Sequence, residues 1–169
     1  MSISKWDCRF MAMAKLIASW SKDPSTKVGA VIVDDKHRVV SVGFNGLPHG
    51  VSDNSERLND RETKLRMVIH AEENALLFAN RSVSGCTAYV WPLLPCARCA
   101  SKLIQAGIRR VVGPANGREH WREENEIAVG LMKEAGISVV AEEHQQSRRK
   151  NSLEEIQAHW AERWGQQDL

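Results

Sequence analysis

The sequence lacks the features that would direct a protein into a membrane or out of the cell. No apolar run in its 169 residues approaches the roughly 20 residues of a membrane span, and its N-terminus has no signal-peptide core. It contains no internal repeat and no low-complexity segment. Only four cysteines are present, and Cys96 and Cys99 form a metal-type pair, which favours a reducing compartment over a disulfide framework. We therefore predict a cytoplasmic protein with no membrane partner.

The chain also has little excess charge of either sign. Its 23 Lys and Arg residues against 21 Asp and Glu residues leave a net charge of +2, which is too small to favour a nucleic-acid partner. A hydrophobic content of 43% and a charged content of 26% are ordinary for a soluble globular domain. The length is sufficient for one domain with a substantial core.

Two short motifs offer ligands for one metal ion. His70-Ala71-Glu72 supplies a ring nitrogen, and Pro95-Cys96-Ala97-Arg98-Cys99 supplies two thiolates. Three protein ligands leave a fourth tetrahedral position open for water, which is typical of a catalytic rather than a structural zinc. Zinc lowers the pKa of such a water to about 7. Glu72 is not needed as a ligand and can take the proton of the water and return it to a leaving amine.

A single Cys-x-x-Cys pair is also found in structural zinc knuckles and redox sites. A structural site would need a fourth ligand, and Cys86 is the cysteine that could supply it. The catalytic interpretation is favoured because an open position beside a carboxylate suits hydrolysis. His-x-Glu followed by Pro-Cys-x-x-Cys is, moreover, the signature of zinc-dependent nucleobase deaminases.

Hydrophobic periodicity and turn residues predict an α/β fold. Helices are expected at 4–20, near 57–64, and at 70–80, 95–106 and 121–135, and strands at 28–33, 39–44, 86–91, 109–112 and 137–140. The first two strands form a hairpin that we expect in the middle of the sheet. Alternating strands and helices in the second half predict parallel pairing through right-handed crossovers. The expected architecture is a three-layer α/β/α sandwich around a five-stranded mixed sheet.

The C-terminal part differs in composition from the rest. Residues 143–169 begin with a polar, basic stretch, which we interpret as a solvated linker. Leu153, Ile156, Trp160 and Trp164 then recur at helical spacing and predict an amphipathic helix. Its partner is either its own domain or a neighbouring subunit.

The segment Gly43-Phe44-Asn45-Gly46-Leu47-Pro48 follows a predicted strand and forms a shaped loop. The Asn45 amide can both donate and accept a hydrogen bond. It suits a contact with a sugar hydroxyl, and it equally suits a structural cap of the turn.

At these residues the chain resembles the deoxycytidylate (dCMP) deaminase family of the cytidine deaminase superfamily. The resemblance covers the chain from about Trp6 to Val140. The segments that carry it are Ser21–Pro24 with Val28–Ala30, Gly43–Pro48, His70–Ala75, Leu94–Ala100 and Ile104–Ile108. The resemblance implies a cytidine deaminase-like fold, with residues 1–142 forming the zinc-dependent deaminase domain and residues 143–169 an appendage.

The resemblance also implies roles for individual residues. His70, Cys96 and Cys99 would bind Zn²⁺, and Glu72 would act as the proton shuttle in hydrolysis of dCMP to dUMP and ammonia. The residues implied to contact the substrate are Asn45 at the deoxyribose, Ser25, Thr26 and Lys27 near the 5′-phosphate, and Ala71. The stretch Trp91–Pro95, which borders the base pocket, is one residue longer than the family form.

Family members are typically homohexamers that dCTP with Mg²⁺ activates and dTTP inhibits. The resemblance implies an effector site that includes Gly43, Asn45, Gly46 and Pro48. Segment 63–67, before the His70 motif, lacks the tyrosines that are often found there in the family.

Two other functions compete with dCMP deamination. The first is deamination of another cytosine nucleotide or of tRNA adenosine, although tRNA deaminases resembling this chain carry Glu-Pro-Cys where Leu94-Pro95-Cys96 stands. The second is a non-catalytic zinc protein that binds nucleotides, and the intact Glu72 argues against it.

Overall fold

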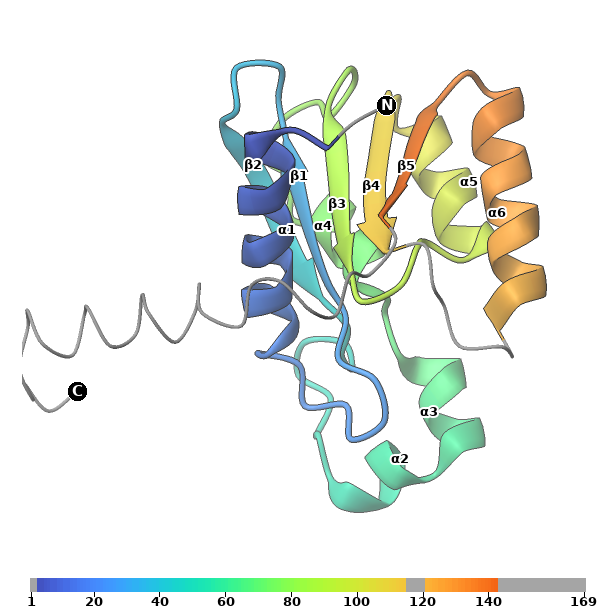
Figure 1. Cartoon of the computed structure of the whole chain (residues 1–169). Coiled ribbons are helices and arrows are strands. Elements are labelled where there is room, and N and C mark those ends of the chain that lie inside the picture. The colour runs from blue at the N-terminus through green and yellow to red at the C-terminus, as the bar shows by residue number, and fades with distance from the viewer. Residues whose placement is uncertain (1–2, 115–120, 143–169) are drawn as a thin grey trace, which may run out of the picture.

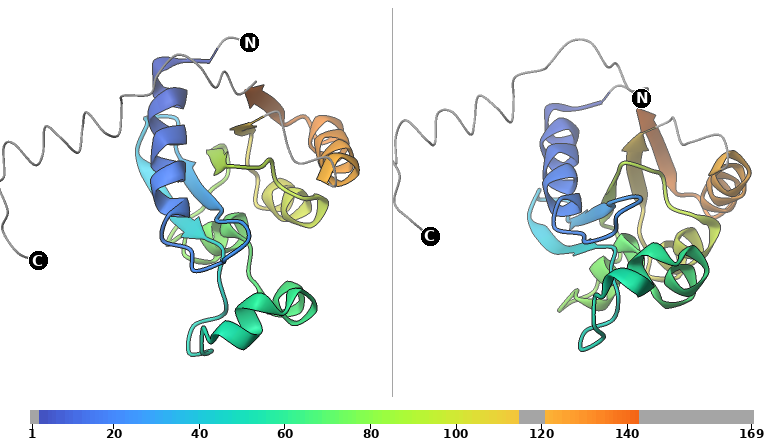
Figure 2. Two further views of the ribbon diagram at one scale, coloured as in Figure 1. Left: turned by 60° about the horizontal axis from the view of Figure 1, so that its bottom comes forward. Right: turned by 90° about the horizontal axis from the view of Figure 1, so that it is seen from below.

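The computed structural model describes residues 3–114 and 121–142, and these residues form one mixed β-sheet with helices on both faces (Figures 1 and 2). The helices are α1 (Lys5–Ala18), α2 (Ser55–Asn59), α3 (Arg61–Met67), α4 (Ala71–Leu77), α5 (Ala97–Gln105) and α6 (Arg122–Glu134). The strands are β1 (Gly29–Val33), β2 (Val39–Phe44), β3 (Thr87–Trp91), β4 (Arg110–Pro114) and β5 (Ser138–Glu142). The predicted three-layer sandwich around five strands is confirmed.

The strand order is β2-β1-β3-β4-β5. β1 pairs antiparallel with β2 and β3, whereas β3, β4 and β5 run parallel, as the alternating strands and helices predict. The expectation that the hairpin lies in the middle of the sheet is wrong for β2, which is an edge strand. Val39 and Phe44 are exposed at its two ends, whereas all five residues of β1 are buried. Hydrophobicity alone did not separate the two strands.

Two hydrophobic clusters cover the two faces of the sheet, because successive strand residues point to opposite sides. On one face, Val31, Val33, Tyr89 and Val112 pack against α1. On the other, a larger cluster joins the sheet to α4, α5 and α6; its strand residues are Ala30, Ile32, Ala88, Val90 and Val111, and its helix residues include Ala71, Ala75, Leu103 and Met132. The helices on this second face carry the residues of the candidate site.

Segment 51–65 is more helical than its polar sequence suggests. It contains α2 and most of α3, and Asp60 ends one helix and caps the next. Its carboxylate accepts hydrogen bonds from the backbone N–H groups of Glu62 and Thr63, a common N-cap arrangement. In Figure 1, this pair of helices lies below the sheet, beneath the ends of β1 and β3.

No helix within residues 3–114 and 121–142 is long and apolar enough to cross a bilayer. The expected linker and amphipathic helix of residues 143–169 lie outside the described residues.

A buried polar network fastens α1 to the sheet. Asp7, which is 2% exposed, accepts hydrogen bonds from the Tyr89 hydroxyl at 2.8 Å and from two Arg110 nitrogens at 2.7 and 3.0 Å. The Ser4 hydroxyl and backbone N–H donate to the same carboxylate and cap α1. Burial alone would raise the pKa of Asp7, but the hydrogen bonds from Arg110, Ser4 and Tyr89 outweigh it and hold that pKa well below its usual range.

We predict that Asp7→Asn lowers the free energy of unfolding by about 2–4 kcal/mol at pH 7, because it leaves Arg110 without its charged partner. Urea denaturation would measure the loss. Because the folded-state pKa of Asp7 is depressed, its stabilisation is present above the unfolded value of about 3.9 and is lost as the pH falls through the lower folded value. The difference between the two proteins should therefore shrink in acid.

Asp35→Asn is the matched control, since Asp35 is exposed in the hairpin turn. Its effect should stay within about 0.5 kcal/mol. Equal losses for the two variants would contradict the role assigned to the network.

Candidate metal and active site

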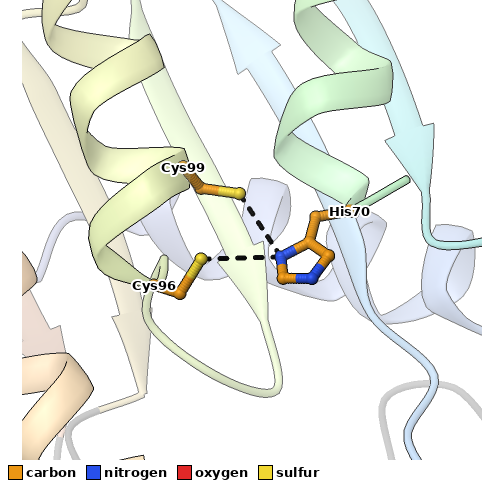
Figure 3. A group of neighbouring side chains, drawn as sticks. All are labelled: His70, Cys96 and Cys99. Atoms are coloured by element: carbon orange, nitrogen blue, oxygen red, sulfur yellow. Dashed lines mark hydrogen bonds between the residues drawn. The ribbon is translucent and has the colours of Figure 1, made fainter. Parts of the chain in front are cut away.

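The candidate site forms where the N-termini of α4 and α5 meet (Figure 3). His70 is the N-cap residue of α4, and Cys96 is the N-cap residue of α5. Cys99 lies in the first turn of α5, one turn beyond Cys96. Both cysteines therefore project from the same end of the helix toward the ring of His70.

The three side chains form a compact donor set. The Nδ1 atom of His70 lies 3.6 Å from the sulfur of Cys96 and 3.4 Å from that of Cys99, and all three ligand atoms lie within 4.8 Å of one another. Zinc bonds of about 2.05 Å to nitrogen and 2.3 Å to sulfur, at a tetrahedral angle, require an N···S distance of about 3.5 Å. The observed distances match this value, so the residues fit a zinc ion bound through Nδ1.

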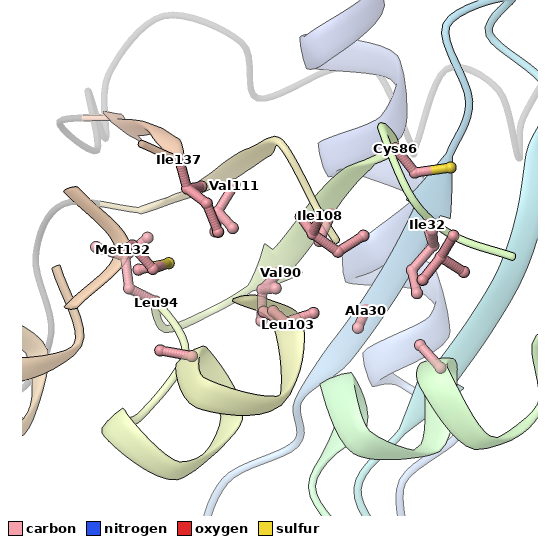
Figure 4. Packing of buried hydrophobic residues seen from close by; sticks show 14 of the residues in the cluster. Ala30, Ile32, Cys86, Val90, Leu94, Leu103, Ile108, Val111, Met132 and Ile137 are labelled. Carbon is pink, nitrogen blue, oxygen red and sulfur yellow. The ribbon is translucent and has the colours of Figure 1, made fainter. Parts of the chain in front are cut away.

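The structure does not bring Cys86 into this set. Cys86 directly precedes β3, whereas Cys96 follows the loop after its other end. Five extended residues span about 16 Å, which separates the two thiols by far more than a metal can bridge. Cys86 is instead buried in the hydrophobic cluster, near Ile32 (Figure 4). The described residues thus offer three ligands at this position, which leaves a tetrahedral ion one open site.

The cysteine pair is electrostatically coupled. The Cys99 thiol donates to the sulfur of Cys96, and this lowers the pKa of Cys96 to about 3, with a further contribution from His70. The same hydrogen bond raises the pKa of Cys99. A hydrogen bond to Cys96 likewise raises the pKa of His70. Cys96 is therefore the more readily ionised of the two thiols, and a cation that binds both sulfurs would displace the proton of Cys99.

Glu72 lies in the first turn of α4 and is 4% exposed. It lines the same cavity as His70 and Cys96. Burial raises the pKa of its carboxyl group. A carboxylate beside the metal ligands, in an enclosed cavity, can accept a proton from a water molecule and pass it on.

The cavity has a volume of about 220 Å³ and extends from the metal ligands to α2 and α3. Six segments line it: the loop before β1, the turn after β2, the α2–α3 segment, the start of α4, the loop after β3 and the start of α6. Their lining residues include Asp23, Ser25, Thr26, Asn45, Arg61, Lys64, Leu65, Ala71, Leu93, Leu94, Trp121 and Asn125.

Of the predicted substrate residues, Ser25, Thr26, Asn45 and Ala71 line this cavity, and Lys27 does not. Asn45 is buried, and its amide holds the neighbouring loop. Its Oδ1 accepts from the backbone N–H of Val28 at 2.8 Å, and its Nδ2 donates to the carbonyl of Thr26 at 2.9 Å. These contacts favour the structural alternative for Asn45, although the residue remains at the cavity wall.

The predicted effector residues Gly43, Gly46 and Pro48 do not line the cavity. Gly43 lies where β2 passes closest to α4. A Cβ atom there would overlap the carbonyl of Ala71 and the backbone nitrogen of Ala75. Gly46 forms a backbone bridge with Ile69, directly before His70. Both glycines therefore help to position the helix that carries Glu72.

Sequence reasoning missed a buried ion pair in the cavity wall. The ammonium group of Lys64 lies 3.0 Å from the Asp23 carboxylate and 3.0 Å from the Ser25 hydroxyl oxygen. Lys64 belongs to a polar segment, and its partner lies 41 residues earlier, so no local pattern could reveal the pair. Arg61, Trp121 and Asn125 were missed for the same reason.

Comparison with known proteins gives a consistent picture. The profile of the cytidine and deoxycytidylate deaminase zinc-binding region matches residues 4–114. The chain is 50% identical to an uncharacterized deaminase in the luxG 3′ region of Aliivibrio fischeri, over 81% of this chain and 93% of that protein. It is 42% identical to deoxycytidylate deaminase of Mus musculus, over 79% and 78% of the two chains.

The fold is similar to the dCMP deaminase of cyanophage S-TIM5, solved in complex with dCMP and dUMP. The TM-score is 0.67 with 22% identity, over 84% of this chain and the whole of that one. At this level of identity, the likeness concerns the fold.

We predict that the purified protein carries one zinc ion per chain and that Cys99→Ser abolishes it, because two remaining ligands cannot hold the ion tightly. Elemental analysis after dialysis would measure the zinc content. Cys8→Ser is the matched control, since Cys8 is an exposed cysteine on α1. Full zinc occupancy in Cys99→Ser would contradict the assigned ligand set.

Proposed function

The chain belongs to the cytidine and deoxycytidylate deaminase family, and we propose that it hydrolyses dCMP to dUMP and ammonia with a bound zinc ion. The observation that carries the proposal is a cavity lined by His70, Cys96 and the buried Glu72, with Cys99 completing the set of three metal ligands beside it. The deoxycytidylate deaminases of mouse and human, at 42% and 40% identity over most of this chain, support the choice of substrate.

His70, Cys96 and Cys99 would hold the zinc ion, which when bound lowers the pKa of a water molecule to about 7. Glu72 would take the proton from the attacking water and deliver it to N3 of the cytosine ring. It would then help to protonate the departing amine at C4, so that ammonia leaves. The burial of Glu72 supports this role, because an enclosed carboxyl group is shielded from exchange with bulk water.

The remaining substrate contacts belong to the same proposal. Ala71 is the first residue of α4, and its backbone N–H has no acceptor within the helix, so it can donate to the carbonyl oxygen of the base. Asn45 would contact the deoxyribose. Ser25 and Thr26 would lie near the 5′-phosphate, and their position on the cavity wall supports this. Lys27 would contribute through its charge at longer range.

Several features rest on the family resemblance alone. They are the homohexamer, the extent of the deaminase domain over residues 1–142, and activation by dCTP with Mg²⁺ or inhibition by dTTP. We propose Gly43, Asn45, Gly46 and Pro48 as the effector residues on that basis. The close approach of Gly43 to α4 and the bridge from Gly46 to Ile69 offer a physical route, since a ligand that shifts this segment would also move Glu72. The cytoplasmic location belongs to the same proposal but rests on the reducing compartment that the cysteine pair favours.

We predict that Glu72→Gln retains zinc but lowers kcat for dCMP by about 10²–10⁴-fold, because the amide cannot carry the proton. Ammonia release from dCMP and the zinc content of the same sample would test this. Glu73→Gln is the matched control, since Glu73 is the next residue of α4 and pairs with Lys102 at 2.5 Å. Its activity should remain close to that of the wild type.

Normal turnover by zinc-loaded Glu72→Gln would exclude Glu72 as the proton shuttle. Wild-type protein that binds dCMP without releasing ammonia would instead indicate a non-catalytic nucleotide-binding protein. Turnover of a different cytosine nucleotide or of an adenosine-containing RNA would show that the proposed substrate is wrong but that the protein is a hydrolytic deaminase.

A further inference from the structure

The cavity wall contains two cationic side chains, Lys64 and Arg61, which differ in whether a carboxylate neutralises them. Lys64 and Asp23 form a buried ion pair, with side chains 7% and 8% exposed. Asp23 also accepts from the backbone N–H groups of Ser25 and Thr26, so its carboxylate is fully engaged. The Asp23 carboxylate therefore neutralises the charge of Lys64, which is not available to a ligand.

Arg61 stands in contrast to this pair. It lines the same cavity, and within residues 3–114 and 121–142 it has no carboxylate or hydrogen-bond partner. Its guanidinium group offers a planar set of donors that matches two oxygens of a phosphate group. Among the described lining residues it is thus the cation with unused binding capacity.

Arg61 belongs to the part of the cavity wall that the α2–α3 segment forms. α3 begins at Arg61, reaches Lys64 after one turn and leads through Val68 and Ile69 to His70. Arg61 therefore lies one helical turn, about 5 Å, before Lys64 along this helix. A substrate whose reacting ring meets Glu72 would extend its other end toward Arg61.

We infer that Arg61 is the residue that selects a 5′-monophosphate, by pairing with the phosphate group of the nucleotide. This inference rests on the proposed function. One unpaired guanidinium suits one phosphate group, and the described wall offers no second unpaired cation for a di- or triphosphate. Lys64 is a positioning residue, which holds the loop from Asp23 to Thr26 in the shape that completes the cavity.

The test compares kcat/KM for dCMP and for deoxycytidine in the zinc-loaded wild type and in Arg61→Ala. We expect kcat/KM for dCMP to fall about 10–100-fold, mainly through KM, while the value for deoxycytidine stays within about twofold. Arg61→Lys should recover part of the loss, since lysine keeps the charge but not the bidentate geometry. Arg66→Ala is the matched control, because Arg66 lies on the same helix with an exposed side chain paired to Glu62.

Binding measurements keep this inference separate from the proposed activity. Calorimetric titration with dUMP and with deoxyuridine requires no turnover, and Arg61→Ala should weaken only dUMP binding, again by about 10–100-fold. That result would support Arg61 even if dCMP were not deaminated. Unchanged preference for dUMP over deoxyuridine in Arg61→Ala, or failure of the wild type to prefer dUMP, would overturn the inference. A selective loss of dUMP binding in Lys64→Met, with Arg61→Ala unaffected, would overturn it as well.

Discussion

The site depends on one constraint: the N-termini of two helices, α4 and α5, must meet. Only then do the His70 nitrogen and the two cysteine sulfurs lie at the distances that one tetrahedral zinc ion requires. His70 and Cys96 occupy equivalent cap positions, so the geometry of the metal site is the geometry of the helix starts. The sheet fixes those starts. α4 packs on β1 and β2, and α5 follows β3 through a short loop. Gly43 permits the close approach of α4, and the Gly46–Ile69 bridge anchors the chain just before His70.

A second, polar layer shapes the other wall of the cavity. Asp23 and Asn45 organise the loop before β1, and Lys64 ties that loop to α3. A buried ion pair contributes little net stability, because desolvation of both charges offsets their attraction. Its value here is conformational, since it gives the loop one shape, whereas the neighbouring Arg61 has no acidic partner among the described residues. In the proposed function, the chemistry and the choice of substrate therefore depend on different segments that line one cavity.

The parts that could be predicted from the sequence are those with a local signal. The metal ligands were proposed because His-x-Glu and Cys-x-x-Cys carry their chemistry within a few residues, and β2 was bounded correctly because its apolar run is short and flanked by turn residues. The edge position of β2 was missed, since strand order is set by pairing across the whole sheet. The Asp7–Arg110 and Asp23–Lys64 pairs were missed because their members lie 103 and 41 residues apart. The contact of Asn45 with the sugar stays a prediction, and the fold shows in addition that its amide holds a loop, which one side chain in the sequence could not reveal.

The central claim is that zinc is held by His70, Cys96 and Cys99 with one position open to water. X-ray absorption at the zinc edge of the zinc-loaded protein tests it most directly. We expect two sulfur neighbours at about 2.3 Å and two nitrogen or oxygen neighbours at about 2.0–2.1 Å, one from His70 and one from water. Three sulfur neighbours, or a closed set of four protein ligands, would make the site structural and contradict the account.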